Sequence, residues 1–486
     1  MSRELTVIVL AAGGGTRMKS KTMKVLHPIC GRTMIGHVLN AVAGSGADRV
    51  VTVVGHQREV VGPHVQQLMP QALLAVQEEQ AGTGHAVRVA VEALLAAEGT
   101  VEGTVLVAYG DTPLLEGESL RALAAEHEAA QRAVSILSAV VAQPFGYGRV
   151  VRDEEGEVVA IVEEKDATPQ QREIAEINSG ILAFDAEFLL SALPRISNDN
   201  AKGEYYLTDA VGIAREDGLA VGALVIDDVL QTEGANDRVQ LAELGREMNH
   251  RILTGWMREG VTVMDPATTW VDADVVLARD VTLLPGTQLL GATAVAEDAV
   301  VGPDTTLKDC EVGEGARVVR THAELAVVGA GAHVGPFSYL RPGTRLGAAG
   351  KIGAFVETKN AEIGAGAKVP HLSYVGDAEI GEGTNIGAGT IVANYDGVAK
   401  HRTKVGRHAR TGSNNTFVAP VEIGDGAATG AGTVVRRDVA PGALAVSAGE
   451  QRSIEGWAER RRPGTAQAGA ARAAREAEES AGPAPE

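Results

Sequence analysis

The sequence predicts an α/β domain, a connecting helix and a parallel β-helix built from six-residue repeats. Over the first half, apolar β-branched runs alternate with helical stretches; from 236 to 260 aliphatic residues recur at spacings of three and four; beyond 261 they recur at every sixth position. The 486 residues suffice for about two to four domains. We therefore expect domains at 1–235, 236–260 and 261–457, followed by a tail at 458–486.

The first domain is expected to contain a largely parallel sheet with helices on both faces. Its apolar strand candidates lie at 6–11, 50–54, 104–108 and 133–141, and a helical stretch lies at 120–131. Strands that are apolar throughout are typical of parallel sheets covered on both faces. Ligands of such sheets bind beyond the carboxyl ends of the strands, where residues 11–17 and 109–111 fall.

The six-residue period of the last domain is regular, as in the series Val328, Val334, Leu340, Leu346 and Ile352. It fits neither the 3.6-residue period of a helix nor the alternation of a flat strand, and it is typical of a β-helix in which each hexad forms one side of a prism. At three hexads per coil we expect about ten coils. Glycine at tight corners would explain 59 glycines beside only 3% aromatic residues.

Composition limits the partners and the compartment. The net charge of −19 disfavours nucleic acid, whose binding requires cations that neutralise phosphates. The two cysteines, Cys30 and Cys310, cannot build a disulfide framework and fit a reducing compartment. No apolar run approaches the ~18–20 residues that span a bilayer, and the run at 5–12 fits a buried strand better than a signal peptide. We expect a cytoplasmic protein without nucleic-acid or membrane partners.

A glycine-rich segment, Gly13-Gly14-Gly15-Thr16-Arg17, follows the first predicted strand. Met18 stands where the dinucleotide-binding pattern requires glycine, and the Gly-Lys-Ser/Thr ending of a P-loop is absent. With Arg17 in the loop and Lys24 soon after it, backbone N–H groups could approach phosphates while the two cations offset their charge. A glycine-rich turn without a ligand is the alternative.

Asp111 and Asn236 are candidate ligands of Mg²⁺. Asp111 ends a buried predicted strand, and Asn236 opens the connecting helix. Mg²⁺ is commonly held by one or two protein oxygens together with substrate phosphates. Two structural alternatives stay open, namely a turn formed by Asp111 and an N-cap formed by Asn236.

The order of the motifs resembles that of the sugar-1-phosphate nucleotidylyltransferases. The motifs are Leu10-Ala-Ala-Gly-x-Gly-Thr-Arg-Met, Lys24-Val-Leu-His27, Gln80-Ala-Gly-Thr-Gly-His-Ala86, Gly110-Asp111, Gly146-Tyr-Gly-Arg149 and Glu176-Ile-Asn-x-Gly180. With His371-Leu-Ser-Tyr374 and Asn394-Tyr-Asp-Gly397 in the repeats, residues 5 to about 457 are similar to the bifunctional N-acetylglucosamine-1-phosphate uridylyltransferase/glucosamine-1-phosphate acetyltransferase family. This resemblance implies a Rossmann-like mixed sheet and a left-handed β-helix.

The resemblance implies a uridylyltransferase site in the first domain. Arg17 and Lys24 would act on the phosphates of UTP, and Asp111 and Asn236 would bind Mg²⁺. Residues implied to contact UTP or the UDP-sugar are Leu10, Ala11, Ala12, Gly13, Lys24, Gln77, Gly82, Thr83, Tyr109, Gly110, Asp111, Gly148, Glu163, Asn178 and Asn236. Among them, Gln77, Gly82 and Thr83 would contact the uracil, and Gly148, Glu163 and Asn178 would hold the sugar. Met23 replaces the proline that usually precedes the lysine in this family, which would loosen the loop.

The resemblance also implies an acetyl-CoA-dependent site in the β-helix. His371 would be the proton acceptor, because an ammonium group must lose a proton before it can attack a thioester. A polar surface histidine is the alternative. Glucosamine-1-phosphate would contact Arg341, Lys359, Tyr374 and Asn385, and acetyl-CoA would contact Ala388, Asn394, Tyr395, Ser413 and Ala431. Ala448 replaces an arginine of the family, so Arg452 or the arginines at 460–462 could contact CoA instead.

The resemblance further implies a homotrimer formed through the β-helix and a product, UDP-N-acetylglucosamine, used in peptidoglycan and lipopolysaccharide synthesis. Two alternatives are a single-activity nucleotidylyltransferase with a regulatory or assembly β-helix, and a non-catalytic assembly subunit. Residues 398–404 interrupt the hexad phase and are expected to form a loop. The Ala/Glu/Pro/Gly-rich tail is expected to be disordered, with a transient helix at 466–478 as the alternative.

Overall fold

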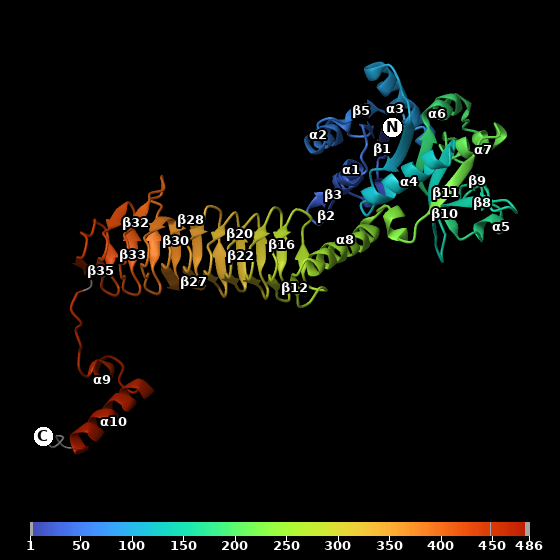
Figure 1. The fold of residues 1–486 in the computed structure, drawn as a ribbon. Coiled ribbons are helices and arrows are strands. Elements are labelled where there is room, and N and C mark those ends of the chain that lie inside the picture. Colours follow the sequence, from blue (N-terminus) through green and yellow to red (C-terminus); the bar gives the residue numbers. More distant parts are fainter. Residues whose placement is uncertain (1–2, 448, 482–486) are drawn as a thin grey trace. The chain divides into compact units, whose positions relative to one another are not determined.

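The computed structural model describes residues 3–447 and 449–481, so Ala448 lies outside the described residues. The chain divides into two compact units, Met1–Ala349 and Gly350–Glu486. The first unit contains an α/β domain, a linker helix and coils of parallel strands, and the second contains further coils and two tail helices (Figure 1). The predicted fold class is confirmed.

A mixed sheet of nine strands forms the centre of the α/β domain (Figure 1). Its main path is β11-β7-β10-β6-β1-β4-β5, which is parallel except where β10 pairs with β7 and β6, and antiparallel β8 and β9 adjoin β10. The strands are β1 (Leu5–Leu10), β4 (Arg49–Val54), β5 (Leu73–Val76), β6 (Thr104–Tyr109), β7 (Val134–Val140), β8 (Gly148–Arg152), β9 (Val158–Val162), β10 (Glu176–Asp185) and β11 (Val221–Val225).

Helices cover both faces of this sheet, as its continuously apolar strands predict. One face packs against α1 (Met34–Gly44), α2 (Arg58–Leu68) and α4 (Gly117–Ala129), and the other against α3 (Thr83–Glu98), α6 (Ala186–Ala192) and α7 (Asp209–Glu216). On β1, Val7 and Val9 face the first group and Ile8 faces the second. Shorter elements are η1 (Thr16–Met18), η2 (Lys24–Leu26), β2 (Pro28–Ile29), β3 (Arg32–Thr33), α5 (Pro169–Arg172), η3 (Leu193–Arg195) and η4 (Val229–Thr232).

The linker helix α8 spans Arg238–Arg258. Its N-cap is Asp237, whose carboxylate accepts hydrogen bonds from the backbone N–H groups of Val239 and Gln240. The alternative interpretation of Asn236 as the N-cap is therefore wrong. Further along the helix, the buried amide of Asn249 bonds to the backbone of Thr269 and Val271, which joins α8 to the first coil.

Parallel strands form coils with the predicted repeat. Gln288 pairs with Thr306, 18 residues further along, so one coil contains three hexads. The strands of the first unit are β12 (Thr262–Val263), β13 (Trp270–Val271), β14 (Val276–Leu277), β15 (Thr282–Leu283), β16 (Gln288–Leu290), β17 (Ala294–Val295), β18 (Val300–Val301), β19 (Thr306–Lys308), β20 (Glu311–Val312), β21 (Arg317–Val318), β22 (Thr321–Glu324), β23 (Val327–Val328), β24 (His333–Val334), β25 (Ser338–Leu340) and β26 (Arg345–Leu346).

The second unit continues the same pattern. Its strands are β27 (Lys351–Ala354), β28 (Glu357–Ile363), β29 (Lys368–His371), β30 (Tyr374–Ile380), β31 (Ile391–Ala393), β32 (Thr403–Val405), β33 (Thr416–Val418), β34 (Val421–Ile423), β35 (Ala428–Thr429), β36 (Val434–Val435) and β37 (Leu444–Ala445). The predicted aliphatic positions point inward, since Ile380, Ile386 and Val392 are at most 1% exposed. Thr403 and Lys404 pair with β34, so the loop expected at 398–404 ends earlier than predicted.

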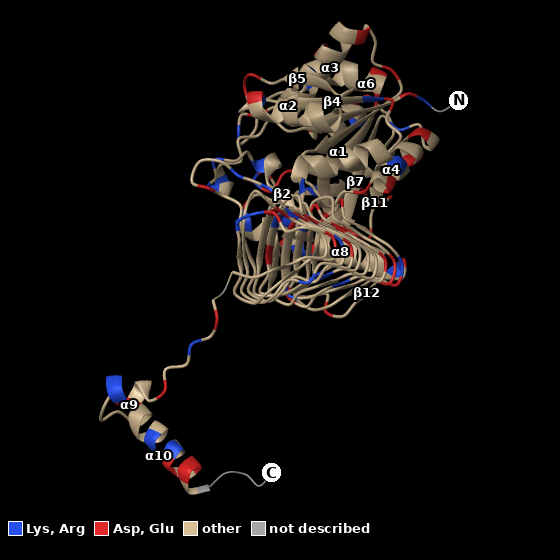
Figure 2. Ribbon diagram, turned by 90° about the vertical axis from the view of Figure 1, so that its left-hand side faces the viewer, with Lys and Arg blue, Asp and Glu red and all other residues tan. Residues whose placement is uncertain are grey.

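The tail that was expected to be disordered contains two helices. It forms α9 (Trp457–Arg461) and α10 (Ala466–Ala481), which carry both basic and acidic residues (Figure 2). Alanine, arginine and glutamate are good helix formers, and an ion pair between Arg475 and Glu459 joins the two helices. Among the described residues, no helix is both long and apolar enough to cross a membrane.

Glycine corners bring successive coils into backbone contact, which predicts an effect of methyl groups on stability. A Cβ at Gly412 would lie 2.5 Å from the backbone nitrogen of Ala431, whereas a Cβ at Gly430 would meet the side chains of Val446 and Thr433 at ordinary distances of 3.4 and 3.6 Å. We expect Gly412→Ala to lower the free energy of unfolding by about 1–3 kcal/mol. Gly430→Ala should change it by less than about 0.5 kcal/mol. Chemical denaturation of both variants measures this, and equal effects would contradict the proposed corner contact.

Candidate functional site

A cleft of about 370 Å³ opens at the carboxyl ends of β1, β5 and β6. This is the edge at which the sequence placed the nucleotide. The cleft is lined by Leu10, Ala11, Ala12, Gly13, Arg17, Lys24, Gln77, Gly82, Thr83, Tyr109, Asp111 and Asn236 from the expected set. The structure thus brings together residues from distant parts of the sequence.

The phosphate loop needs glycine at position 15. Gly15 has a φ of +58°, and a Cβ there would overlap with the side chain of Lys24. Its backbone therefore approaches the stem of the lysine that follows the loop. Met23, which replaces the family proline, has a φ of −58°, within the range of proline, and is 4% exposed. Burial of Met23 thus holds a backbone conformation that proline would also adopt.

Two cations and two oxygen-bearing side chains meet at the floor of this cleft. The Lys24 ammonium pairs with the Asp111 carboxylate and donates a hydrogen bond of 2.7 Å to Oδ1 of Asn236. The Arg17 guanidinium donates to the same Oδ1 at 2.8 Å. The side chains of Lys24 and Asp111 are 13% and 22% exposed, so the charges are only partly solvated. The ammonium of Lys24 therefore contacts the side-chain oxygens of both Asp111 and Asn236.

This oxygen pair suits a hard divalent cation. Among the described residues, no group of three or more His, Cys, Asp or Glu side chains is arranged to hold a metal by itself. Mg²⁺ needs fewer protein ligands, since waters and substrate phosphates complete its shell. The donor chemistry of Asp111 and Asn236 fits Mg²⁺ in that role.

The expected uracil contacts lie on a loop with a constrained backbone. Nε2 of Gln77 donates to the carbonyl oxygen of Gly82 at 3.2 Å. Gly82 has a φ of +109°, and a Cβ there would lie 2.6 Å from the carbonyl oxygen of Tyr205. The hydroxyl of Thr83 accepts a hydrogen bond from the backbone of Leu207. These contacts fasten the loop to the segment at 204–207.

The residues expected to contact the sugar gather beside the cleft rather than in its lining. Gly148 pairs with Asn178, and a Cβ on Gly148 would lie 3.3 Å from Oε1 of Glu163. Burial raises the pKa of Glu163. Burial, followed by the charges of Glu163 and Asp111, also raises the pKa of Tyr109, which lines the cleft. Tyr109 is therefore close enough to both Glu163 and Asp111 to feel their charges.

Some cleft residues were not predicted as contacts. Gln80 donates from Nε2 to the carbonyl oxygen of Ala12 at 2.7 Å, and it stands in a motif already noted, so the sequence held a signal for it. Glu204 also lines the cleft, and no local pattern indicated it. The other additional lining residues are Gly15, Thr16, Val25 and Ala86. Gly110, in contrast, is buried and bonds through its N–H to the carbonyl of Leu10.

The β-helix places four expected residues along one corner. Backbone N–H groups of Gly389, Asn414 and Gly432 donate to the carbonyl oxygens of His371, Ala388 and Ser413, respectively. His371, Ala388, Ser413 and Ala431 therefore stand on consecutive coils. The carbonyl of His371 also accepts from the buried hydroxyl of Ser373 at 2.7 Å, which fixes the backbone while the histidine side chain stays exposed.

A polar network lies next to this corner. Nδ2 of Asn394 donates to Asp377 at 2.5 Å and lies 3.4 Å from the Tyr374 hydroxyl. Burial opposes ionisation of Asp377, but hydrogen bonds from Asn360 and Asn394 and the charges of Lys359 and Lys400 lower its pKa overall. The network therefore presents Lys359, Tyr374 and Asn394 around one carboxylate.

The remaining expected residues belong to other strands and loops. Arg341 follows β25 in the first unit, and Asn385 pairs with Lys368 in the second. Tyr395 is 59% exposed in the loop after β31. Arg452 is exposed, whereas Arg462 lies over the Trp457 ring, with Cζ 4.8 Å from its centroid. Ala448 lies outside the described residues, so the contact that replaces the family arginine stays open.

Comparisons with known proteins identify relatives over nearly the full length of the chain. A MobA-like NTP transferase domain model matches residues 7–171. The bifunctional protein GlmU of Rhodococcus jostii is 60% identical over 481 residues, covering 98% of this chain and 96% of its own length. GlmU of Paenarthrobacter aurescens is 58% identical, with 97% and 94% covered, and that of Streptomyces avermitilis is 57% identical, with 97% and 98% covered.

The raised pKa of Glu163 predicts a cost to stability at neutral pH. The unfolded chain ionises this carboxyl more readily than the folded one, so the penalty is absent below the unfolded pKa of ~4.5 and grows as the pH rises through the folded pKa. We expect Glu163→Gln to raise the melting temperature at pH 7.5 on the order of 2 °C, and the gain to vanish near pH 4.5. Exposed Glu155→Gln is the control. A gain independent of pH would contradict this explanation.

Proposed function

The chain belongs to the bifunctional GlmU family, and from this membership and the two sites we propose how its activities are divided. It is an enzyme that makes UDP-N-acetylglucosamine for cell wall synthesis. We assign acetyl transfer from acetyl-CoA to glucosamine-1-phosphate to 261–457, and uridylyl transfer from UTP to N-acetylglucosamine-1-phosphate, with release of pyrophosphate, to 1–235. The single-activity alternative is not favoured, because full-length relatives at this identity are named bifunctional.

The main support for the uridylyltransferase assignment is the cluster in which Lys24 contacts Asp111 and Asn236. Arg17 contacts the same Asn236. A sugar phosphate is a competent oxygen nucleophile at neutral pH, since its second pKa is ~6, and needs no general base. The protein must align its attack on the α-phosphorus and offset the charge that spreads to the pyrophosphate. Arg17 and Lys24 supply cations for this purpose, and their present oxygen partners would be exchanged for phosphate oxygens.

Asp111 and Asn236 would hold Mg²⁺ beside these cations. The metal, when bound, supplies charge neutralisation to the triphosphate. Gln77, Gly82 and Thr83 would orient the uracil, and Gly148, Glu163 and Asn178 would orient the sugar. The half-buried carboxyl of Glu163 suits a hydrogen bond from a sugar hydroxyl.

The corner of consecutive coils supports the acetyltransferase assignment. There the amine of glucosamine-1-phosphate would attack the thioester carbonyl and His371 would take the amine proton, while CoA leaves as a thiolate that is then protonated. In the described part of the chain the N–H of Ala388 donates no hydrogen bond, so it is available for the developing oxyanion. The sugar phosphate would contact Arg341, Lys359, Tyr374 and Asn385, and CoA would follow Ala388, Asn394, Tyr395, Ser413 and Ala431.

We also propose a homotrimer formed through the β-helix. Phe355 and Leu372 have φ of +57° and +49° and are 60% and 62% exposed. Such residues cost of order 1–3 kcal/mol in backbone strain, and their exposed apolar side chains gain nothing from water. Burial against neighbouring subunits would offset both costs next to His371. We place the enzyme in the cytoplasm, since its substrates are intracellular metabolites and both cysteines are free.

Separate sites should be separable by mutation. We expect His371→Ala to slow CoA release with glucosamine-1-phosphate by about 10²–10⁴-fold while UTP-dependent pyrophosphate release stays near wild type. Asp111→Ala should do the reverse, with a loss of about 10–100-fold or more. Assays of both products for both variants, with UTP, ATP, GTP and CTP in parallel, check this. Loss of both activities in either variant, or preference for another nucleotide, would overturn the assignment.

The trimer is tested by its mass. Wild-type protein should sediment at three times the 50.3 kDa chain mass. Phe355→Asp should yield smaller species and lose acetyl transfer, because the new charge would be buried between subunits. Ile454→Asp, a change at a 63% exposed apolar residue outside the coils, serves as the control. A monomeric wild type, or an intact Phe355→Asp trimer, would contradict the proposed interface.

A further inference from the structure

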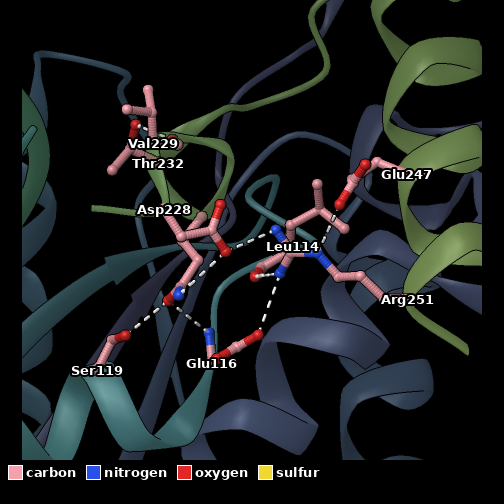
Figure 3. A network of polar contacts seen from close by, with 9 residues as sticks. Leu114, Glu116, Ser119, Asp228, Val229, Thr232, Glu247 and Arg251 are labelled. Atoms are coloured by element: carbon pink, nitrogen blue, oxygen red, sulfur yellow. Dashed lines mark hydrogen bonds and ion pairs between the residues drawn. The ribbon is translucent and has the colours of Figure 1, made fainter. Parts of the chain in front are cut away.

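Arg251 in the middle of α8 is bonded to both segments that lead to the expected metal ligands (Figure 3). Its Nη1 donates to the carbonyl oxygen of Leu114 at 3.2 Å and to the carboxylate of Glu116 at 3.1 Å. Its Nη2 donates to Asp228 at 2.8 Å, and its Nε donates to Glu247 on the same helix at 3.0 Å. One guanidinium therefore joins three parts of the chain.

The first of these segments starts at Asp111 and the second ends at Asn236. Leu114 and Glu116 directly follow the Asp111 turn, and Asp228 opens η4, which leads to Asn236. Gln231 adds a second link, since its Oε1 accepts from the hydroxyl of Ser119 at 2.7 Å and from the N–H of Glu116 at 3.3 Å. The two segments are therefore joined by bonds away from the expected metal ligands as well as at the ligands themselves.

Apolar packing connects α8 with the residues next to Arg17, Asp111 and Asn236. Leu114 and Ala235 lie in one buried cluster with Met18, which adjoins Arg17, and with Leu244 of α8. The N–H of Ala235 donates to the carbonyl oxygen of Asp111 at 3.3 Å. A shift of α8 would thus move the neighbours of Arg17, Asp111 and Asn236 together.

Electrostatics make Arg251 hard to replace. The carboxylates of Glu116, Asp228 and Glu247 all face its guanidinium, whose side chain is only 22% exposed. Without it, three like charges would repel one another between the two segments. A planar fork can donate to several acceptors at once, which a lysine ammonium on a flexible stem does less well.

We propose that Arg251 is a positioning residue that sets the separation of Asp111 and Asn236 and thereby the Mg²⁺ requirement of uridylyl transfer. This inference rests on the proposed function of the first domain. It also gives α8 a second task, because Asn249, two residues earlier, fastens the same helix to the first coil. The helix that joins the coils to the domain is then also the support of the metal site.

The test compares Arg251→Met with Arg246→Met, a matched loss of charge on the same helix. Arg246 is exposed, and its guanidinium has no hydrogen bond or ion pair with any residue that the structure describes. Groups bonded directly to metal ligands cost roughly 10–100-fold in metal affinity when removed. Because Arg251 acts one step further away, we expect Arg251→Met to raise the Mg²⁺ activation constant about tenfold, with acetyl transfer unchanged. The Mg²⁺ activation constant of Arg251→Lys should lie between those of Arg251→Met and Arg246→Met.

A second measurement is independent of turnover. In metal-free protein, Arg251→Met should speed amide hydrogen exchange at 111–116 and 228–236 and leave the β-helix unchanged, whereas Arg246→Met should match wild type. Mn²⁺ binding in the presence of UTP alone, followed by electron paramagnetic resonance, should weaken in the same variant. Glu116→Gln removes one carboxylate partner of Arg251 but keeps the guanidinium. It should change the Mg²⁺ activation constant, the hydrogen exchange and the Mn²⁺ binding in the same direction as Arg251→Met, but by less.

The outcomes separate this inference from the function on which it rests. An unchanged Mg²⁺ constant and unchanged exchange in Arg251→Met would overturn the positioning role, even with normal wild-type uridylyl transfer. Faster exchange throughout the chain, or loss of both activities, would reduce Arg251 to a general stabilising residue and also overturn it. A wild type that lacks Mg²⁺-dependent uridylyl transfer would instead overturn the proposed function, while the exchange data would still decide whether Arg251 orders the two segments.

Discussion

The ammonium of Lys24 between the oxygens of Asp111 and Asn236 is the interaction around which the first domain is organised. The three side chains come from the segment after the phosphate loop, from the end of β6 and from the start of α8. Their convergence requires both the parallel sheet, which brings strand ends together, and the apolar cluster of Met18, Leu114 and Ala235 beneath them. In a chain with a net charge of −19, such placed cations are what an anionic nucleotide can recognise.

The second site depends on a different constraint, which is close contact between backbones at the corners of coils. Gly387 and Gly412 lie beside the corner that carries Ala388 and Ser413, and a Cβ on either glycine would overlap with the backbone of the next coil. Residues at equivalent points of successive coils are therefore neighbours, although about 18 residues separate most of them. The exception is the step from Ile391 to its partner Thr416, which is longer because the chain inserts the loop containing Asn394 and Tyr395.

The two constraints meet in α8. Asn249 bonds to the first coil, while Arg251 bonds to the segments of the nucleotide site, and Asp237 caps the helix and leaves Asn236 to face Lys24. Buried or half-buried polar groups must find partners, and these partners lie in different parts of the fold. In the proposed nucleotide site, α8 is therefore a structural support as well as a connection.

The amino-acid sequence was sufficient to predict the alternation of strands and helices, the six-residue period and the glycine-rich loop before Lys24, because steric and packing rules act on residues close together in the chain and produce periodic patterns. Composition alone misjudged the tail, where helix formers at 466–481 made a helix. Three features are evident only in the folded chain: Asp237 and not Asn236 caps α8, Glu204 reaches the cleft, and Arg251 joins Leu114 to Asp228. These contacts join residues that are distant in the sequence. Local sequence patterns do not indicate which distant residues become neighbours in the folded chain.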